Sequence, residues 1–359
     1  MINLLNPKRQ PQSLILLVTF ALAHGSAFAA ANWPALHDAA FSIQGEGVDQ
    51  GATVATDQPD FEFRSGFWMN LHHFLFLQAV LAAPDSRKGH AEFSARDSAG
   101  AHKMSAEQTL AWNKAVAYYA RFGKLDPLAD QELILVNYEL SDAGNSPTLE
   151  GRKLPPELKS ALETAAPVYR ALWWEEQDRL NRRWIAAAAK LVGQYSAIGP
   201  KIASLYKTDW PGEKTPVEVT LYANWAGAYT VIGSTLITIS SVDPGDQGNA
   251  ALETLFHEAS HALVDSLGQQ LAADIRKVNK TPTFQLVHAI IFYTAGAVTS
   301  KALERNGVRG YVPYALKNGL YTRVPVWTHY REICERDWQP YIDGKITYEE
   351  ALSRIANDL

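Results

Sequence analysis

The chain has 359 residues, enough for one large domain or two smaller ones, and its 47% hydrophobic and 20% charged residues argue against disorder. The net charge of −5 and the lack of any Lys/Arg-rich run argue against a nucleic-acid partner. The single cysteine, Cys334, excludes a disulfide within the chain and any metal site that needs two cysteines.

The first 29 residues have the pattern of a secretory signal peptide. Lys8 and Arg9 precede a short apolar stretch at residues 14–23, and Ala27-Phe28-Ala29 matches a small-x-small cleavage site. No later stretch of about 18 residues is apolar throughout, so we expect no membrane span after cleavage. We therefore predict an exported bacterial protein, periplasmic or secreted; the single cysteine favours the periplasm. An uncleaved membrane anchor is the alternative.

Residues 30–210 are predicted to be mainly helical after an irregular start at residues 30–66. Ser105 and Gln108 form a capping box at the start of one helix. The predicted helices cover residues 67–83, 109–123, 130–141 and 155–194, the last as one long helix or two joined ones. The adjacent His72 and His73 face different ways on the first helix, so we predict core or capping roles for them.

The pattern changes after Pro211-Gly212. Residues 217–222 (VEVTLY) alternate apolar and polar side chains, and residues 227–232 and 235–239 are rich in β-branched residues. These segments predict a small antiparallel sheet of two or three strands. Helices are then predicted at 250–267 and 281–305, followed by a loop at 308–326 and two short helices. The predicted fold class is α+β, predominantly helical.

The first of these two helices contains the motif HEASH. His257 and His261 lie four residues apart, so on a helix both imidazoles point to one side and can bind one ion. Catalytic zinc takes three protein ligands and keeps one position open for water. Glu258 follows His257 directly and cannot share its direction, but it can act as general base and acid on that water. The alternative is a solvent-facing His/Glu helix face.

The order strand, strand, turn and helix, with HEASHALVD in the helix, resembles the zincin metallopeptidases, and among them the thermolysin-like gluzincins. The resemblance covers residues 217–302, and the motif is specific for the superfamily rather than for one family within it. It implies a zincin-like core, zinc as cofactor and a peptide or protein substrate. It also implies a substrate-docking edge at residues 223–226, for which an ordinary turn is the alternative.

The third zinc ligand departs from the gluzincin pattern, because no glutamate lies between His261 and Leu303. His288 is our predicted ligand, since it lies in an otherwise apolar stretch on the next helix, although a core histidine is the usual role in such a place. Asp274 and Glu304 are the alternatives. Asp265, four residues after His261, is better placed to accept a hydrogen bond from an imidazole N–H than to bind the ion.

The sequence thus predicts a signal peptide (1–29), a helical region (30–210), a zincin-like catalytic core (211–307) and a C-terminal loop with helices packing on it (308–359). The predicted function is zinc-dependent hydrolysis, most simply of peptide bonds. A non-catalytic periplasmic binding or scaffold protein with a structural or degenerate zinc site is the alternative. Candidates for stabilising an oxyanion are Tyr311, Tyr314, Tyr321, Arg323 and His329. The sequence indicates neither the cleavage specificity nor the oligomeric state.

Overall fold

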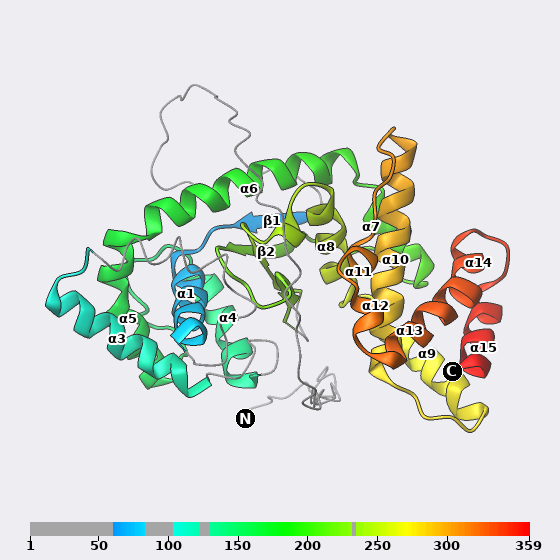
Figure 1. Cartoon of the computed structure of the whole chain (residues 1–359), viewed down its shortest axis with the longest axis horizontal. Helices are drawn as coiled ribbons and strands as arrows, with labels where there is room; N and C mark the ends of the chain where they lie inside the picture. Colours follow the sequence, from blue (N-terminus) through cyan, green and yellow to red (C-terminus); the bar gives the residue numbers. More distant parts are fainter. Residues whose placement is uncertain (1–59, 83–102, 123–129, 232–234) are drawn as a thin grey trace, which may run out of the picture. The chain divides into compact units, whose positions relative to one another are not determined.

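A computed structural model describes residues 60–82, 103–122, 130–231 and 235–359 (Figure 1). The predicted signal peptide lies outside the described residues. The described chain is mostly helical and contains one small mixed sheet, so the prediction of a predominantly helical α+β fold is confirmed.

The helices between residues 67 and 205 follow the predicted pattern closely, apart from the last of them. They are α1 (Phe67–Ala82), α3 (Ala106–Tyr119), α4 (Gln131–Ala143), α5 (Pro156–Leu172), α6 (Trp174–Gln194) and α7 (Ile198–Leu205). The capping box at α3 is present with both of its hydrogen bonds, and Asp130 caps α4 by accepting from the backbone N–H of Leu133. The chain leaves helical geometry at Trp173, so residues 155–194 form two joined helices. We did not predict α7.

The sheet has four strands in the order β1-β2-β4-β3. The strands are β1 (Phe61–Arg64), β2 (Thr215–Thr220), β3 (Ala228–Thr230) and β4 (Ile237–Ser240). The prediction of an antiparallel sheet is wrong for most of it, because β2 pairs in parallel with both β1 and β4, and only β3 and β4 are antiparallel. Parallel strands need a long connection, and here the helices from α1 to α7 connect β1 to β2.

The predicted helix at residues 250–267 is divided in two. Helix α8 (Asn249–Ser260) ends in a turn, and α9 (Asp265–Lys277) starts after it. Leu263 and Val264 are buried in this turn, so the bend places two apolar side chains in the core. Helix α10 (Phe284–Arg305) follows, with Thr283 as its N-cap.

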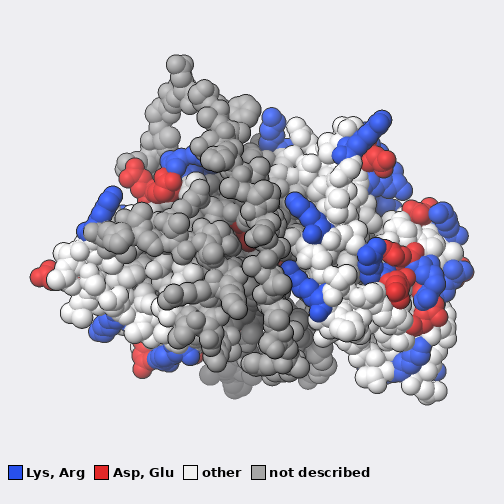
Figure 2. All heavy atoms as spheres, viewed as in Figure 1, with Lys and Arg blue, Asp and Glu red and all other residues white. Residues whose placement is uncertain are grey.

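The C-terminal region is more helical than predicted. The segment at residues 308–326 contains two short helices, α11 (Tyr314–Lys317) and α12 (Leu320–Arg323), where we predicted a loop. The remaining elements are α13 (Pro325–Ile333), a π-helical turn (Cys334–Trp338), α14 (Gln339–Ile342) and α15 (Tyr348–Asp358). Figure 2 shows basic and acidic side chains intermingled over one face of this region. Several form exposed ion pairs, such as Arg331–Glu335 and Arg354–Glu350, each worth about 1 kcal/mol or less.

Two large hydrophobic clusters and one small one, formed by Ala223, Tyr229, Val231 and Leu236, hold the described residues together. One large cluster contains buried side chains of α1, α3, α4 and α5, and the second joins the sheet to α6–α10 and the C-terminal helices. The clusters do not follow the predicted boundary at residue 210, because β1, α6 and α7 lie before it but pack in the second cluster. Helix α10 is long and apolar enough to cross a membrane, yet most of it is buried in this cluster, as in the core helix of a folded domain.

The adjacent histidines of α1 are core residues, as predicted. His72 Nδ1 lies 2.7 Å from the hydroxyl of Tyr119, and His73 Nε2 lies 2.7 Å from the hydroxyl of Tyr229. Asn137 donates a further hydrogen bond to the Tyr229 hydroxyl. All of these side chains are buried, so the network fastens β3, which carries Tyr229, to α1 and α4.

Glu218 on β2 is a fully buried carboxyl group whose ionisation should make stability depend on pH. Its two oxygens accept hydrogen bonds from the Ser141 hydroxyl and the Gly66 N–H, but burial still raises its pKa to about 7. Between the ordinary pKa near 4.5 and this value, the folded state holds a proton that the unfolded state has lost. Stability is therefore highest below this range and falls as the pH rises through it.

We expect Glu218→Gln to remove this loss of stability at higher pH. The difference in unfolding free energy between the variant and wild type should shift in favour of the variant by up to about 3 kcal/mol from pH 5 to pH 8. A change in hydrogen bonding caused by the substitution has the same effect on stability at both pH values, so it cancels when the two are compared. Urea unfolding at both pH values measures the effect, and an equal difference between the proteins at pH 5 and pH 8 would contradict it.

Candidate metal centre

Helices α8 and α10 bring three histidines together. His257 and His261 lie one turn apart at the end of α8, and His288 lies on α10, which packs beside α8. One nitrogen from each ring lies within 4.8 Å of the other two. The ring centroids are 5.0 to 5.5 Å apart. The structure thus unites the predicted ligand set from two helices.

Aromatic side chains surround the three rings. Phe292, one turn beyond His288 on α10, stacks on His257 with a centroid distance of 3.8 Å. Trp327 from α13 meets His288 edge to face at 5.8 Å. His257 is buried, whereas His261 and His288 are partly exposed, so the cluster is accessible on the side of the latter two. Packing on flat rings restricts the rotation of the imidazoles and favours one arrangement.

The three histidines are in the form that binds metals. Burial lowers the pKa of His261 to about 4 and holds those of His257 and His288 well below 6.5, with repulsion between the rings as a smaller cause. Each imidazole is therefore neutral at pH 7 and has a free lone pair. His257 Nδ1 is also buried and has no hydrogen-bond partner within the described part of the chain. Such an orphaned nitrogen is costly unless a ligand or a water satisfies it.

Glu258 is buried directly beside the cluster. Its Oε1 lies 4.0 Å from His257 Nε2, and its Oε2 lies 2.6 Å from the hydroxyl of Thr230, the last residue of β3. Burial raises the pKa of Glu258 to about 7, and the hydrogen bond from Thr230 opposes this rise. A carboxyl group with a pKa near neutrality can both accept and return a proton at pH 7.

The alternative ligands lie elsewhere. Asp274 on α9 pairs with Lys277 at 2.8 Å, and Glu304 is exposed near the end of α10. Asp265 is exposed in the first turn of α9, because the helix we expected to carry both it and His261 ends at Ser260. Among the described residues, no hydrogen bond joins Asp265 to a histidine. The structure therefore gives no support to its predicted role as an acceptor for an imidazole N–H.

The predicted docking edge at residues 223–226 is a turn. The Ala226 N–H donates to Asn224 Oδ1 at 2.8 Å, and the Gly227 N–H donates to the Asn224 carbonyl at 3.2 Å. The preceding strand β2 is an inner strand, paired on both sides. The strand at the edge of the sheet next to the histidines is β3, whose Thr230 contacts Glu258. The geometry is therefore that of the ordinary turn we considered as the alternative.

Several residues of the site were not assigned by sequence reasoning. Glu253, one turn before His257, is buried and accepts hydrogen bonds from the Tyr311 hydroxyl at 2.5 Å and the Tyr314 N–H at 3.0 Å. These bonds hold the segment before α11 against α8. The Tyr314 ring then stacks on Phe292, with a centroid distance of 6.2 Å, and its hydroxyl donates to the Ala226 carbonyl. The sequence signal that could have indicated a role for Glu253 is that a glutamate lies within the apolar stretch before the motif.

Of the five residues considered for stabilising an oxyanion, Tyr314 and Tyr321 contact rings that pack on the histidines. Tyr314 stacks on Phe292, and Tyr321 packs against Trp327 with a centroid distance of 6.1 Å. The Tyr321 hydroxyl is buried against the Ala289 carbonyl, and His329 is a partly exposed neighbour of Glu332. Arg323 is exposed and donates to the Asn318 carbonyl.

Comparison with known proteins gives no further information on this site. No protein-family model matches the chain, and no significant match was found among curated proteins or solved structures.

Proposed function

We propose that His257, His261 and His288 bind one zinc ion and that the protein is a zinc-dependent hydrolase. The convergence of three neutral imidazoles from two packed helices is the observation that carries this proposal. The buried Nδ1 of His257 has no hydrogen-bond partner among the described residues, so a ligand or a water can bind there. Imidazole nitrogens suit zinc, and three of them form a known catalytic ligand set.

Glu258 is the proposed general base and acid. Zinc, when bound, supplies a Lewis acid that lowers the pKa of water and polarises a carbonyl group. The Glu258 carboxylate accepts the proton of the attacking water and returns it to the leaving group, for which a pKa near 7 is suited. The Thr230 hydroxyl, 2.6 Å from Oε2, holds this carboxylate in place and leaves Oε1 on the side of the histidines.

A peptide bond is the proposed substrate, and the HEASH motif with its neighbouring strand supports this choice. The short strand β3 lies at the edge of the described sheet and ends at Thr230 beside Glu258, and edge strands are where extended peptides bind to sheets. Export is proposed from the basic start, apolar stretch and cleavage site of residues 1–29.

A structural zinc site is the rival proposal, and the ligand count argues against it. A structural site has four protein ligands. Within the described ranges, the side chains grouped closely enough to share one ion are the three histidines, and Glu258 lies beside this group. One coordination position is then left for water or substrate.

Metal analysis and activity together test the proposal. We expect protein lacking residues 1–29 to purify with about one zinc per chain and to hydrolyse members of a mixed peptide library. Removing zinc with a chelator should stop hydrolysis, and adding zinc back should restore it. Folded protein that neither contains zinc nor takes it up would contradict the metal site. Full zinc loading without hydrolysis of any peptide would favour the structural role.

A further inference from the structure

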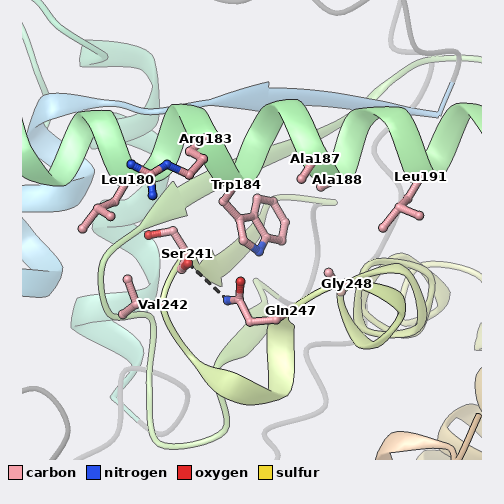
Figure 3. Close-up of a pocket in the computed structure, with 11 residues that line it drawn as sticks. Leu180, Arg183, Trp184, Ala187, Ala188, Leu191, Ser241, Val242, Gln247 and Gly248 are labelled. Atoms are coloured by element: carbon pink, nitrogen blue, oxygen red, sulfur yellow. Dashed lines mark hydrogen bonds between the residues drawn. The ribbon is translucent and has the colours of Figure 1, made fainter. Parts of the chain in front are cut away.

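A second site lies at the opposite end of α8 from the histidines. A hollow of about 360 Å³ opens between α6 and the segment that links β4 to α8, and Figure 3 shows the side chains around it. Of the described residues that line it, none is acidic, and Arg183 is basic. Helix α8 has 12 residues, about 18 Å at 1.5 Å per residue, so this hollow is separate from the histidine cluster.

The start of α8 faces this hollow without a side-chain cap. Gly248 is the N-cap, lines the hollow and has no side chain to accept from the first backbone N–H groups. The first turn carries no acidic residue. One N–H, that of Ala250, is taken by the Gln247 carbonyl at 3.2 Å. The first turn of α8 therefore supplies no carboxylate that would offset the partial positive charge of the helix start.

Ser241 supplies an independent sign of a ligand. Its side chain lines the hollow and is only 7% exposed, yet its hydroxyl has no hydrogen-bond partner among the residues that the structure describes. Its backbone carbonyl is used, because it accepts from the Gln247 side-chain amide at 3.2 Å (Figure 3). Buried hydroxyl groups are normally hydrogen-bonded, so the free hydroxyl is a donor in need of an acceptor.

Arg183 stands out among the arginines of α6. Arg179 pairs with Glu176 at 2.6 Å, and Arg182 pairs with Asp178 at 2.6 Å. Arg183 makes no ion pair within the described part of the chain, and in Figure 3 its guanidinium lies on the same side of the hollow as Ser241. An arginine fork is well suited to carboxylate and phosphate groups.

The rest of the lining is apolar. The indole N–H of Trp184 donates to the Asp246 carbonyl at 2.7 Å, so this polar group is already satisfied. The Trp184 ring and Leu191 then offer apolar surface beside the charged end of the hollow (Figure 3). A polar end next to an apolar wall is typical of sites for small organic molecules.

We propose that this hollow binds a small organic anion. Its carboxylate or phosphate group lies against Ser241 and Arg183, and a short hydrocarbon part packs on Trp184 and Leu191. The start of α8 adds a favourable partial positive charge at the other side of the hollow. The proposal does not depend on the zinc site or on hydrolysis.

Calorimetric titration of the full mature chain tests this site with four probes: hexyl phosphate, hexanoate, inorganic phosphate and hexanol. We expect saturable binding of hexyl phosphate or hexanoate at millimolar concentration or tighter, and the stronger of the two identifies the head group. Inorganic phosphate lacks the hydrocarbon part and hexanol lacks the charge, so each should bind at least about tenfold more weakly.

Substitutions locate the binding. Arg183→Gln should weaken binding of the better anion at least about tenfold, and Ser241→Ala should weaken it severalfold. Arg179→Gln is the matched control, because it removes the same charge from the same helix outside the hollow. Arg183 is exposed, so its variant should fold, and circular dichroism checks this. Absence of saturable binding of both anions, or equal weakening by Arg183→Gln and Arg179→Gln, would overturn the proposal.

Discussion

Replacing Glu258 by glutamine is expected to abolish peptide hydrolysis while zinc stays bound. Glutamine has the size of glutamate but cannot accept a proton, so the rate should fall by about a hundredfold to ten-thousandfold. The three histidines are unchanged, so the zinc content should remain that of wild type. Turnover of a cleaved peptide from the library and zinc per chain, measured on the same preparation, give the two readouts.

Glu218→Gln is the matched control for this variant. Glu218 is also buried and its pKa is also raised to about 7, but it lies on β2 and contacts Ser141 and Gly66. Loss of a buried carboxyl group alone would slow both variants, whereas loss of a general base would slow only Glu258→Gln. Hydrolysis that persists at the wild-type rate in Glu258→Gln would exclude the proposed base.

Removing His288 is expected to abolish zinc binding. Loss of a residue that only supports a ligand weakens metal affinity about 10–100-fold. Loss of one of three direct ligands should therefore weaken it more than about a hundredfold. Competition with a chromophoric chelator measures the affinity of His288→Ala against wild type. Zinc should raise the melting temperature of wild type and leave that of His288→Ala unchanged, because only a bound ion stabilises the folded state.

Asp274→Ala and Glu304→Ala are the comparison variants, since both residues were alternatives for the third ligand. Asp274 is paired with Lys277 and Glu304 is exposed, so both variants should bind zinc as wild type does. Zinc-free wild type is the reference for folding, and its near-ultraviolet circular dichroism should match that of His288→Ala. If a variant of Asp274 or Glu304 loses zinc while His288→Ala keeps it, the third ligand is that residue and not His288.

Much of the helical structure could be predicted because its signals are local. The capping box at Ser105 and the N-caps at Asp130, Thr283 and Thr347 each form the hydrogen bonds that their sequence pattern requires. The clustering of His257 with His261 follows from their spacing on a helix.

The sheet could not be predicted in the same way, because its pairing is not local. Strand β1 is only four residues long, and its sequence FEFR is too short to show a clear alternation. The parallel pairing of β2 with β4 skips β3, which lies between them in the sequence but at the edge of the sheet. The bend after Ser260 lacks glycine and proline, the usual signals of a break. It depends on the burial of Leu263 and Val264.

The candidate site likewise has residues that could be predicted from the sequence and residues whose roles depend on tertiary packing. The sequence pointed to His288 through its place on the next helix, and the packing of α10 beside α8 brings it to the other two histidines. Thr230 and Phe292 gave no signal, because a threonine at the end of a strand and a phenylalanine in an apolar helix are ordinary core residues. Their contacts with Glu258 and His257 arise only when the sheet and the two helices pack together.

The parallel pairing of β1 with β2 also determines the order in which the chain can fold. The hydrogen bond from Gly66 to Glu218, at the end of this pairing, joins residues 152 positions apart. Closing so long a loop is entropically unfavourable, and folds that depend on such distant contacts form slowly. The strands β2, β3 and β4 and helix α8 are consecutive, so we expect the histidine pair and its neighbouring strand to assemble early. Strand β1, although it is synthesised first, then completes the sheet last.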